Sequence, residues 1–178
     1  MRNRINEIKE SIKVLLSNPA YRIFLVAICI LAFFFSFTSF KGVTASNEMY
    51  PTFNKGEKLI AMKSNSYTYG DIVAYKSPLD TSDAYIIRRV IGLPGDTIYF
   101  HDGTLYINGA ATDEEYVYYD PSKEGYVEGI IYTLEDNQYF LAGDNRNFSV
   151  DSRVCGGIDS SVIFGKIVFS TSKFFSFG

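Results

Sequence analysis

Side chains that can do chemistry are concentrated in one short stretch, residues 143–153, directly after the apolar run 139–142. The stretch reads Gly-Asp-Asn-Arg-Asn-Phe-Ser-Val-Asp-Ser-Arg, and it combines turn-forming residues with two hydroxyls, two carboxylates and two guanidinium groups. A hydroxyl can attack a carbonyl carbon when a neighbouring base takes its proton, and fixed charges can orient that base. The stretch taken alone therefore indicates an enzyme site.

Two further segments complete a pattern with this stretch. One is Ser46-Asn47-Glu48-Met49-Tyr50-Pro51-Thr52, and the other is Gly70-Asp71-Ile72-Val73 followed by Arg88-Arg89-Val90-Ile91-Gly92-Leu93-Pro94-Gly95-Asp96. Together the three segments resemble type I signal peptidases, a family that cleaves exported proteins with a serine nucleophile and a lysine base. Three ordered segments at family-like spacing are a specific signal, whereas each segment alone would be a weak one.

The first segment is similar to the family pattern Ser-x-Ser-Met-x-Pro-Thr. Ser46 falls on the family's first serine, whose hydroxyl helps to form the oxyanion hole. Met49, Pro51 and Thr52 match without a gap. Glu48 falls on the nucleophile, so the resemblance puts a carboxylate where the family has its attacking hydroxyl.

The other two segments carry the base and its support in the family. Arg88 falls on the lysine of the pattern Lys-Arg-Val-Ile-Gly-Leu-Pro-Gly-Asp. Ser149 matches the serine that holds this lysine, and Asp151 and Arg153 match a buried support pair. The resemblance therefore implies a preserved cleft and support around two substituted catalytic positions.

The two substituted residues cannot carry out the family's reaction. Arginine stays protonated and has no lone pair with which to accept a proton. Glutamate is a poor nucleophile toward an amide and has no hydroxyl proton to transfer. Since loss of either member of such a dyad costs several orders of magnitude in rate, we predict no peptidase activity through Glu48 and Arg88. A charge-assisted, bidentate pair between the two side chains is the alternative role that we expect for them.

Three other routes to catalysis remain open at the level of sequence. In the first route, Ser46 acts as the nucleophile in place of residue 48. The shift of two residues along an extended chain moves the hydroxyl about 6–7 Å, which is too far for catalytic geometry. In the second, Lys58, Lys63 or Lys76 is recruited as the base, although these have the character of surface lysines. In the third, Glu48 acts together with Asp151 in a carboxylate-catalysed hydrolysis. An active signal peptidase is therefore retained as the alternative function.

An apolar segment precedes these motifs. Residues 23–40 contain no charged side chain, and about 20 apolar residues, with roughly 17 tolerated, span a bilayer as a helix. A buried helix or a signal peptide cleaved near Thr44-Ala45-Ser46 is the alternative. Because the basic residues come before the segment, we expect a cytoplasmic N-terminal part at 1–22, a transmembrane anchor at 23–40 and an extracellular domain at 41–178. Residues 5–16 have helical periodicity, and Asn18-Pro19 ends that helix.

The remainder of the chain has the pattern of a β domain. Short β-branched and aromatic runs are separated by glycine, proline and aspartate, and they predict strands at 71–75, 85–87, 97–100, 104–107, 130–134, 139–142 and 162–170. Residues 101–104 predict a hairpin, and Asn108-Gly109 predicts a second turn. Residues 113–137 are acidic and rich in tyrosine, and we interpret them as an excursion from the sheet. The fold class is mainly β, a signal-peptidase-like coiled antiparallel sheet or barrel after one N-terminal transmembrane helix.

Composition limits the classes of ligand. The net charge of the 178 residues is −3, and it divides into +3 before Lys41 and −6 after that point. A mildly acidic domain argues against a nucleic-acid partner. A single histidine, His101, and two cysteines, Cys29 and Cys155, without paired spacing argue against a metal site and against a disulfide. We expect no cofactor, and we expect His101 to be exposed beside its hairpin turn.

The expected partners follow from the resemblance. The family's cleft holds its substrate as an extended strand, so a member without the dyad would bind an exported polypeptide without cutting it. In lacking the dyad, the chain is similar to signal-peptidase-like proteins of Gram-positive pilus assembly, which assist the sortase-driven polymerisation of pilins. This resemblance implies a membrane-bound partner of pilins, and possible contact with sortase, as a chaperone in surface pilus assembly. A purely structural membrane protein is a third possibility.

Overall fold

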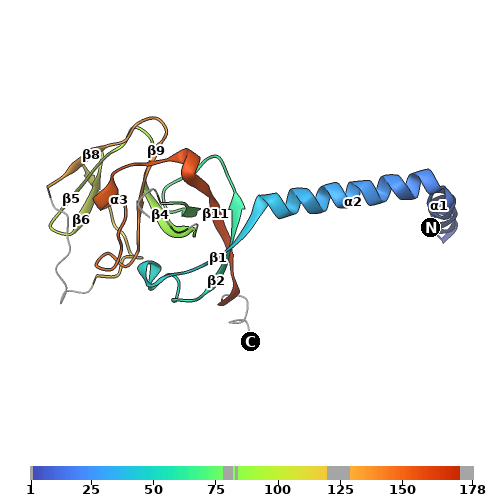
Figure 1. Cartoon of the computed structure of the whole chain (residues 1–178), viewed down its shortest axis with the longest axis horizontal. Coiled ribbons are helices and arrows are strands. Elements are labelled where there is room, and N and C mark those ends of the chain that lie inside the picture. Colours follow the sequence, from blue (N-terminus) through green and yellow to red (C-terminus); the bar gives the residue numbers. More distant parts are fainter. Residues whose placement is uncertain (1, 78–81, 83, 120–128, 173–178) are drawn as a thin grey trace. The chain divides into compact units, whose positions relative to one another are not determined.

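The computed structural model describes residues 2–77, 82, 84–119 and 129–172 of the chain, and the chain divides into two compact units, residues 1–39 and residues 40–178 (Figure 1). The predicted strand at 130–134 lies within the described residues. Part of the predicted excursion at 113–137, namely residues 120–128, lies outside them.

The first unit consists of two helices, α1 (Arg2–Ser17) and α2 (Pro19–Ser39). The predicted helix at 5–16 is confirmed, and it ends at the predicted place. Asn18 lies between the two helices. Its side-chain Oδ1 accepts a hydrogen bond of 2.9 Å from the Ala20 amide and so caps the first turn of α2. Pro19 suits the first position of a helix because its fixed φ is helical and its missing N–H would have no partner there.

The apolar segment 23–40 is helical as far as Ser39. Phe40 is instead the first residue of strand β1, where it pairs with Met62. None of the helices in the described part of the chain is long and apolar enough to cross a membrane.

The second unit is built from two antiparallel sheets. The seven-stranded sheet has the order β1-β2-β11-β3-β4-β9-β10, and the four-stranded sheet has the order β7-β6-β5-β8. The strands are β1 (Phe40–Thr44), β2 (Lys58–Lys63), β3 (Ile72–Tyr75), β4 (Ile86–Gly92), β5 (Thr97–His101), β6 (Thr104–Ile107), β7 (Ala110–Ala111), β8 (Ile131–Thr133), β9 (Gln138–Ala142), β10 (Ile158–Asp159) and β11 (Ile163–Ser170). The predicted fold class, a mainly β domain of coiled antiparallel sheet, is confirmed.

Three short helical turns interrupt the strands. These are η1 (Asn47–Met49), α3 (Ser152–Cys155) and η2 (Ser160–Val162). The turn η1 precedes β2, whereas α3 and η2 lie on either side of β10. Sequence periodicity did not predict any of the three, because a segment of three or four residues is too short to show a helical repeat.

The core forms because buried and exposed side chains alternate along the strands. In β2, Leu59 and Ala61 are buried, whereas Lys58, Ile60 and Met62 face outward. One buried cluster connects the two sheets, with members from β4, β5, β6 and β9 and one residue directly after β8: Ile91, Ile98, Phe100, Leu105, Leu134, Phe140 and Ala142. The two sheets therefore enclose a shared apolar layer, which fixes β4 and its neighbours in place.

Two tight turns connect the strands of the small sheet as predicted. Asp102 and Gly103 have φ of 47° and 74°, and Asn108 and Gly109 have φ of 53° and 84°. Positive φ at both central residues is the requirement of the hairpin turn that Asn-Gly and Asp-Gly favour. His101 next to the first turn is 66% exposed, as predicted.

Candidate functional site

The two side chains at the positions of the expected dyad form an ion pair. The Arg88 Nη2 atom lies 2.8 Å from Glu48 Oε1, and Arg88 Nη1 donates a 3.0 Å hydrogen bond to Glu48 Oε2. The Arg88 side chain is only 1% exposed, whereas Glu48 is 26% exposed. The contact is therefore bidentate and charge-assisted, the stronger class of ion-pair geometry.

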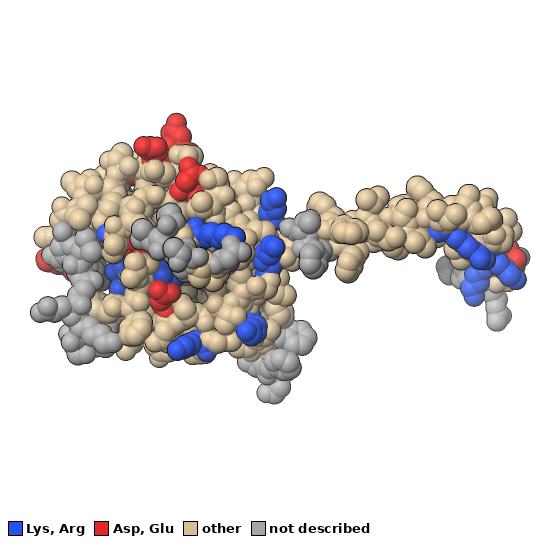
Figure 2. Space-filling view, viewed as in Figure 1, with Lys and Arg blue, Asp and Glu red and all other residues tan. Residues whose placement is uncertain are grey.

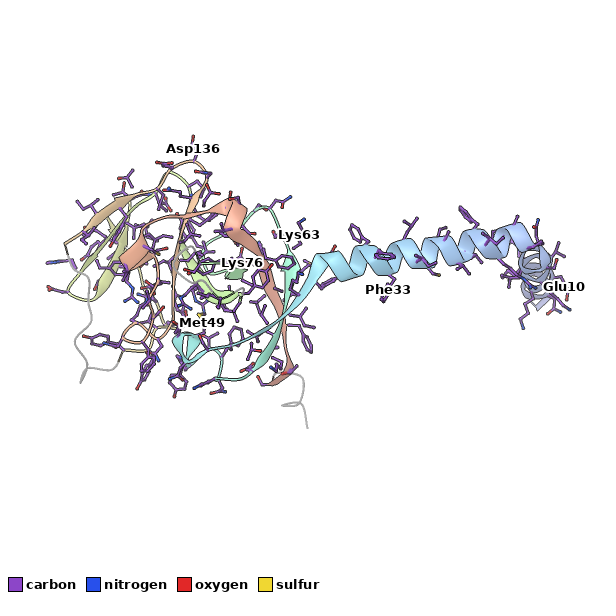
Figure 3. The ribbon with its side chains drawn as sticks, viewed as in Figure 1. Glu10, Phe33, Met49, Lys63, Lys76 and Asp136 are labelled. Atoms are coloured by element: carbon purple, nitrogen blue, oxygen red, sulfur yellow. The ribbon has the colours of Figure 1, made fainter. Side chains whose placement is uncertain are left out.

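Strand β4 and the turn η1 position this pair. Arg88 lies in the middle of β4 and is registered against Val73 of β3. Glu48 is the central residue of η1, whose last residue, Met49, is fully buried in the core (Figure 3). Met49 therefore fixes the turn in the apolar core, while the carboxylate of the preceding residue, Glu48, remains partly exposed.

Ser46 is the third member of this group. Its hydroxyl donates a 2.6 Å hydrogen bond to Glu48 Oε2, which is also the oxygen that accepts from Arg88 Nη1. Ser46, Glu48 and Arg88 therefore form one connected polar group, as the resemblance implies for these positions. Pro51, the other predicted cleft residue in this segment, is exposed and follows a cis peptide bond at Tyr50-Pro51.

The stretch 143–153 is bonded to the η1 turn. The Asn145 amide donates to the Glu48 carbonyl at 3.0 Å, and the Asn145 side chain donates to the Asn47 carbonyl at 3.1 Å. Arg88 Nη2 donates to the Val150 carbonyl at 2.9 Å. The segments that sequence analysis grouped together are therefore in contact in the structure.

Gly143 allows the closest approach within this group. A Cβ atom at this position would lie 2.7 Å from the Glu48 carbonyl oxygen and would overlap the Ser149 side chain. Real Cβ atoms do not approach carbonyl oxygens this closely, so a side chain at position 143 would displace either η1 or Ser149. The glycine is therefore a packing requirement of the site.

Ser149 does not hold the residue at the position of the lysine. Its buried hydroxyl oxygen makes no hydrogen bond to Arg88, whose Nε is also without a hydrogen-bond partner among the described residues. The physical reason is that the Arg88 guanidinium directs its terminal nitrogens to Glu48 and to two backbone carbonyls, those of Ile87 and Val150. The hydroxyl instead lies close enough to the Asp151 carboxylate to help lower the pKa of that group.

Asp151 and Arg153 form the predicted buried support pair. Arg153 Nε and Nη2 each lie 2.8 Å from a carboxylate oxygen of Asp151, and the Gly143 amide donates to the same carboxylate at 2.9 Å. Burial by itself would raise the pKa of Asp151, but the hydrogen bonds and charge of Arg153, with the Gly143 amide, lower it overall. Asp151 is therefore held as a carboxylate that braces the loop.

Sequence analysis missed two further ion pairs. Arg89 contacts the fully buried Asp144 through Nε at 2.8 Å and through Nη2 at 2.6 Å. Arg146 contacts Glu114 through both terminal nitrogens, at 2.8 Å and 2.7 Å. Arg89, Asp144 and Arg146 lie within the quoted segments, but Glu114 lies in the acidic segment 113–137, where no motif marked it.

Tyr116 connects this acidic segment to the same network. Its hydroxyl donates to Glu114 Oε1 at 2.6 Å, and the Arg89 guanidinium lies 3.9 Å from the centre of its ring. Burial, followed by the Glu114 charge and hydrogen bond, raises the pKa of Tyr116. Glu114 and Tyr116 of the predicted excursion therefore cover Arg146 and Arg89. Residues 131–133 of the same segment instead belong to the small sheet, as strand β8.

The lysines considered as alternative bases lie elsewhere. Lys58 Nζ donates to Thr44 Oγ1 at 2.9 Å, and Lys63 and Lys76 line a separate cavity beside Phe164. All three are exposed, as expected of surface lysines. A neutral amine is the group that can take a proton from a hydroxyl in a serine–lysine site, and Arg88 cannot replace it. The group at position 88 is therefore a guanidinium paired with a carboxylate and not a neutral amine.

The chain has clear similarity to known proteins. A family model described as "Signal peptidase, peptidase S26" matches residues 18–172. "Signal peptidase I" of Bacillus licheniformis is 36% identical over 163 residues, which covers 85% of this chain and 82% of that protein. "Signal peptidase IB" of Staphylococcus aureus is 33% identical over 147 residues, which covers 72% of this chain and 75% of that protein.

A solved structure agrees with these matches. The crystal structure of a signal peptidase I from Enterococcus faecalis V583 superposes with a TM-score of 0.50 at 31% sequence identity. The superposition covers 58% of this chain and 97% of the enterococcal chain. The β domain accordingly has its counterpart in a protein described as a signal peptidase I.

Proposed function

The chain belongs to the signal peptidase S26 family, and from this premise we propose that it is a member that holds exported polypeptides without cleaving them. The Glu48–Arg88 ion pair is the observation that carries the proposal. These residues fall on the nucleophile and the base in the resemblance described above. A carboxylate and a guanidinium that are bonded to each other offer neither an attacking hydroxyl nor a proton acceptor of the family's type.

The polypeptide would bind in the family's manner, as an extended strand along the cleft beside η1 and β4. The site is suited to binding because its charges are held in fixed pairs, so that a bound chain need not neutralise them. The similarity to signal-peptidase-like proteins of pilus assembly favours a pilin as the polypeptide and sortase as a neighbouring enzyme. We include both in the proposal on that basis alone.

The second candidate is an active signal peptidase, and two observations favour it. The relatives that match this chain carry the name signal peptidase, and the Ser46 hydroxyl donates to a carboxylate oxygen of Glu48. A Ser46 nucleophile with a Glu48 base would require that oxygen to accept the proton. Protonation of Glu48 would remove the negative charge that both of its contacts with Arg88 depend on, and so would weaken the ion pair. The cost of weakening this pair favours the binding function over the catalytic one.

The proposed location is the cell membrane, with the segment 23–40 as the anchor, residues 1–22 in the cytoplasm and residues 41–178 outside. Alkaline extraction of membranes from cells that produce the full chain tests the anchor. A chain held by a spanning segment stays in the pellet, and a chain released into the supernatant contradicts the anchor.

The binding function is tested with the full chain in detergent and a preprotein or pilin precursor that contains an extended Ala-x-Ala segment. We expect a stable complex, with the added polypeptide intact by mass spectrometry. The matched control replaces Gly143 with alanine, which would shift η1 against the cleft. Equal capture by the control and by the unaltered chain would contradict binding at this cleft.

A further inference from the structure

A cavity opens at the edge of the small sheet, where the apolar layer between the two sheets ends. It has a volume of about 480 Å³, and its apolar lining comes from β4, β6 and β7: Val90, Ile91, Leu105, Ile107 and Ala110. Ile91 and Leu105 also belong to the buried cluster that connects the two sheets. The cavity is therefore an open end of the core, and it offers apolar side chains to a ligand.

Strand β7 leaves this end of the core open. It is the outermost strand of the small sheet, and its two residues are the alanines Ala110 and Ala111. Ala110 is registered against Ile107, so the two side chains lie on the same face of the sheet, and both line the cavity. A methyl group covers little of this apolar face. One more strand beside β7, with a larger apolar side chain on this face, would close the layer.

The backbone of Ala111 can pair with such a strand. Ala111 is registered against Tyr106, and the next amide along the chain, that of Thr112, donates to the Leu105 carbonyl at 2.9 Å. Because hydrogen-bonded and non-hydrogen-bonded pairs alternate in an antiparallel ladder, the N–H and C=O of Ala111 point away from β6. Among the described strands, none lies on that side of β7. An extended polypeptide is therefore the class of ligand that this edge can take, by strand addition.

The charge at the rim of the cavity complements a basic side chain. Among the described residues, the lining includes the carboxylates of Asp113 and Glu114 and no lysine or arginine. Both oxygens of Glu114 already accept from Arg146, and one of them also accepts from Tyr116. Asp113 is exposed and forms no ion pair with another described residue. Figure 2 shows Lys and Arg side chains gathered on the side of the β domain that carries β1, β2 and β11, strands of the other sheet. A cation from the ligand is therefore the group that complements Asp113.

We propose that this cavity binds an extended polypeptide that carries an apolar residue and a lysine or arginine two positions apart. Side chains two positions apart on a strand lie on the same face, so both can point into the cavity. The apolar side chain packs against Leu105 and Ile107, the basic side chain pairs with Asp113, and the backbone pairs with Ala111. The cleft beside η1 is a different site, and the inference does not depend on the loss of peptidase activity.

Hydrogen exchange at the Ala111 amide of the full chain tests the proposal. The probe is the peptide acetyl-Ser-Thr-Leu-Thr-Lys-Thr-Ser-amide, which contains no Ala-x-Ala segment for the cleft. We expect exchange at Ala111 to slow about tenfold when the free peptide is at about ten times its Kd, because the amide exchanges only in the unoccupied chain. A peptide with glutamine in place of the lysine should bind about threefold more weakly, as expected for loss of an exposed ion pair.

Two variants separate the apolar and the charged part of the site. Ala110→Leu fills the cavity from an exposed position, so it should abolish the protection while the chain unfolds like the unaltered one. Asp113→Asn should reduce the affinity for the lysine peptide to that for the glutamine peptide. The matched control is Glu115→Gln, at an exposed neighbouring position that does not line the cavity, and it should leave the affinity unchanged.

Four results would overturn the proposal. They are exchange at Ala111 that the lysine peptide does not slow, full protection in Ala110→Leu, equal affinities for the lysine peptide and one with glutamate in its place, and equal effects of Asp113→Asn and Glu115→Gln. Displacement of the peptide by hexylamine at the same concentration would also overturn it, because the site would then take a free amine and not a strand.

Discussion

Arg88 and Glu48 are joined by two contacts, Nη2 to Oε1 at 2.8 Å and Nη1 to Oε2 at 3.0 Å, across 40 residues of sequence. The same guanidinium donates to the carbonyls of Ile87 and Val150. One buried side chain therefore connects β4, the turn η1 and the loop 143–153. The two positions that match the family's dyad in the sequence pattern therefore hold these three segments together in this chain.

Replacement of Arg88 by methionine should destabilise the β domain. The change leaves the Glu48 carboxylate without its partner and frees two carbonyls, and removing one member of a buried pair costs about 3 kcal/mol. Chemical denaturation of the full chain, followed by the fluorescence of its tyrosines, measures the change. Lys55→Met is the matched control, since Lys55 is exposed, and it should unfold like the unaltered chain.

The double variant Arg88→Met/Glu48→Gln distinguishes the interaction energy of the pair from the contacts that each side chain makes with other residues. Because a double-mutant cycle isolates the interaction of two residues in contact, the second change should cost less in the Arg88→Met background than alone. Strictly additive effects would show that the two side chains do not stabilise each other. An Arg88→Met chain as stable as the unaltered chain would remove the structural role of the pair.

Alanine at position 143 should also destabilise the site. Its Cβ atom would lie 2.7 Å from the Glu48 carbonyl oxygen and would overlap Ser149. Overpacking of this kind costs about 1–3 kcal/mol. Addition of Ser149→Gly should recover part of the loss, because it removes one of the two overlaps, and denaturation curves of both variants measure the recovery. No recovery would mean that the contact with Ser149 is not the source of strain.

Acid should weaken the loop through Asp151. Because the folded-state pKa of Asp151 is below the unfolded value of about 3.9, its stabilisation is fully present above that value. It is lost as the pH falls through the folded-state pKa. The difference in unfolding free energy between the unaltered chain and Asp151→Asn should therefore shrink below about pH 4. Asp136→Asn, at an exposed position (Figure 3), is the control, and its difference should stay near zero throughout.

Glutamine at position 114 should release the segment that covers the buried arginines. The Arg146 side chain is 1% exposed and depends on Glu114 for both of its terminal contacts. We expect faster amide exchange at residues 117–119 and 144–146, where Tyr118 is bonded to the backbone of Asp144 and Arg146. Glu115→Gln, a neighbouring exposed position, should leave the exchange unchanged. Equal exchange in both variants would contradict a covering role for Glu114.

Much of the fold was predictable because its strands carry local signals. The strands at 97–101 and 104–107 are flanked by Asp-Gly and Asn-Gly turns, and the structure has the predicted positive φ at these residues. Strands β1 and β2 were missed, because β1 begins inside the apolar segment and β2 alternates lysines with small or apolar residues. The pairing of β2 with β11 is non-local and leaves no mark in a short window of sequence.

The site was predictable where residues lie within a motif. Glu48, Arg88, Asp151 and Arg153 were each identified from the family pattern, and the structure pairs them as expected. Glu114 was missed because it reaches Arg146 across 32 residues from a segment with no motif. Ser149 matches the serine that holds the lysine in the family pattern, but at position 88 the longer, planar guanidinium donates to the Val150 carbonyl instead.

The most direct test of the central claim is the cleavage of a preprotein by the unaltered full chain, followed by mass spectrometry of the products. The matched variant Glu48→Ser/Arg88→Lys restores the residue types of the family dyad within the same scaffold. We expect no product above the rate in buffer for the unaltered chain, and cleavage at the signal-peptide boundary for the double variant. Cleavage at that boundary by the unaltered chain, abolished by Ser46→Ala, would contradict a binding-only function and would identify Ser46 as the nucleophile.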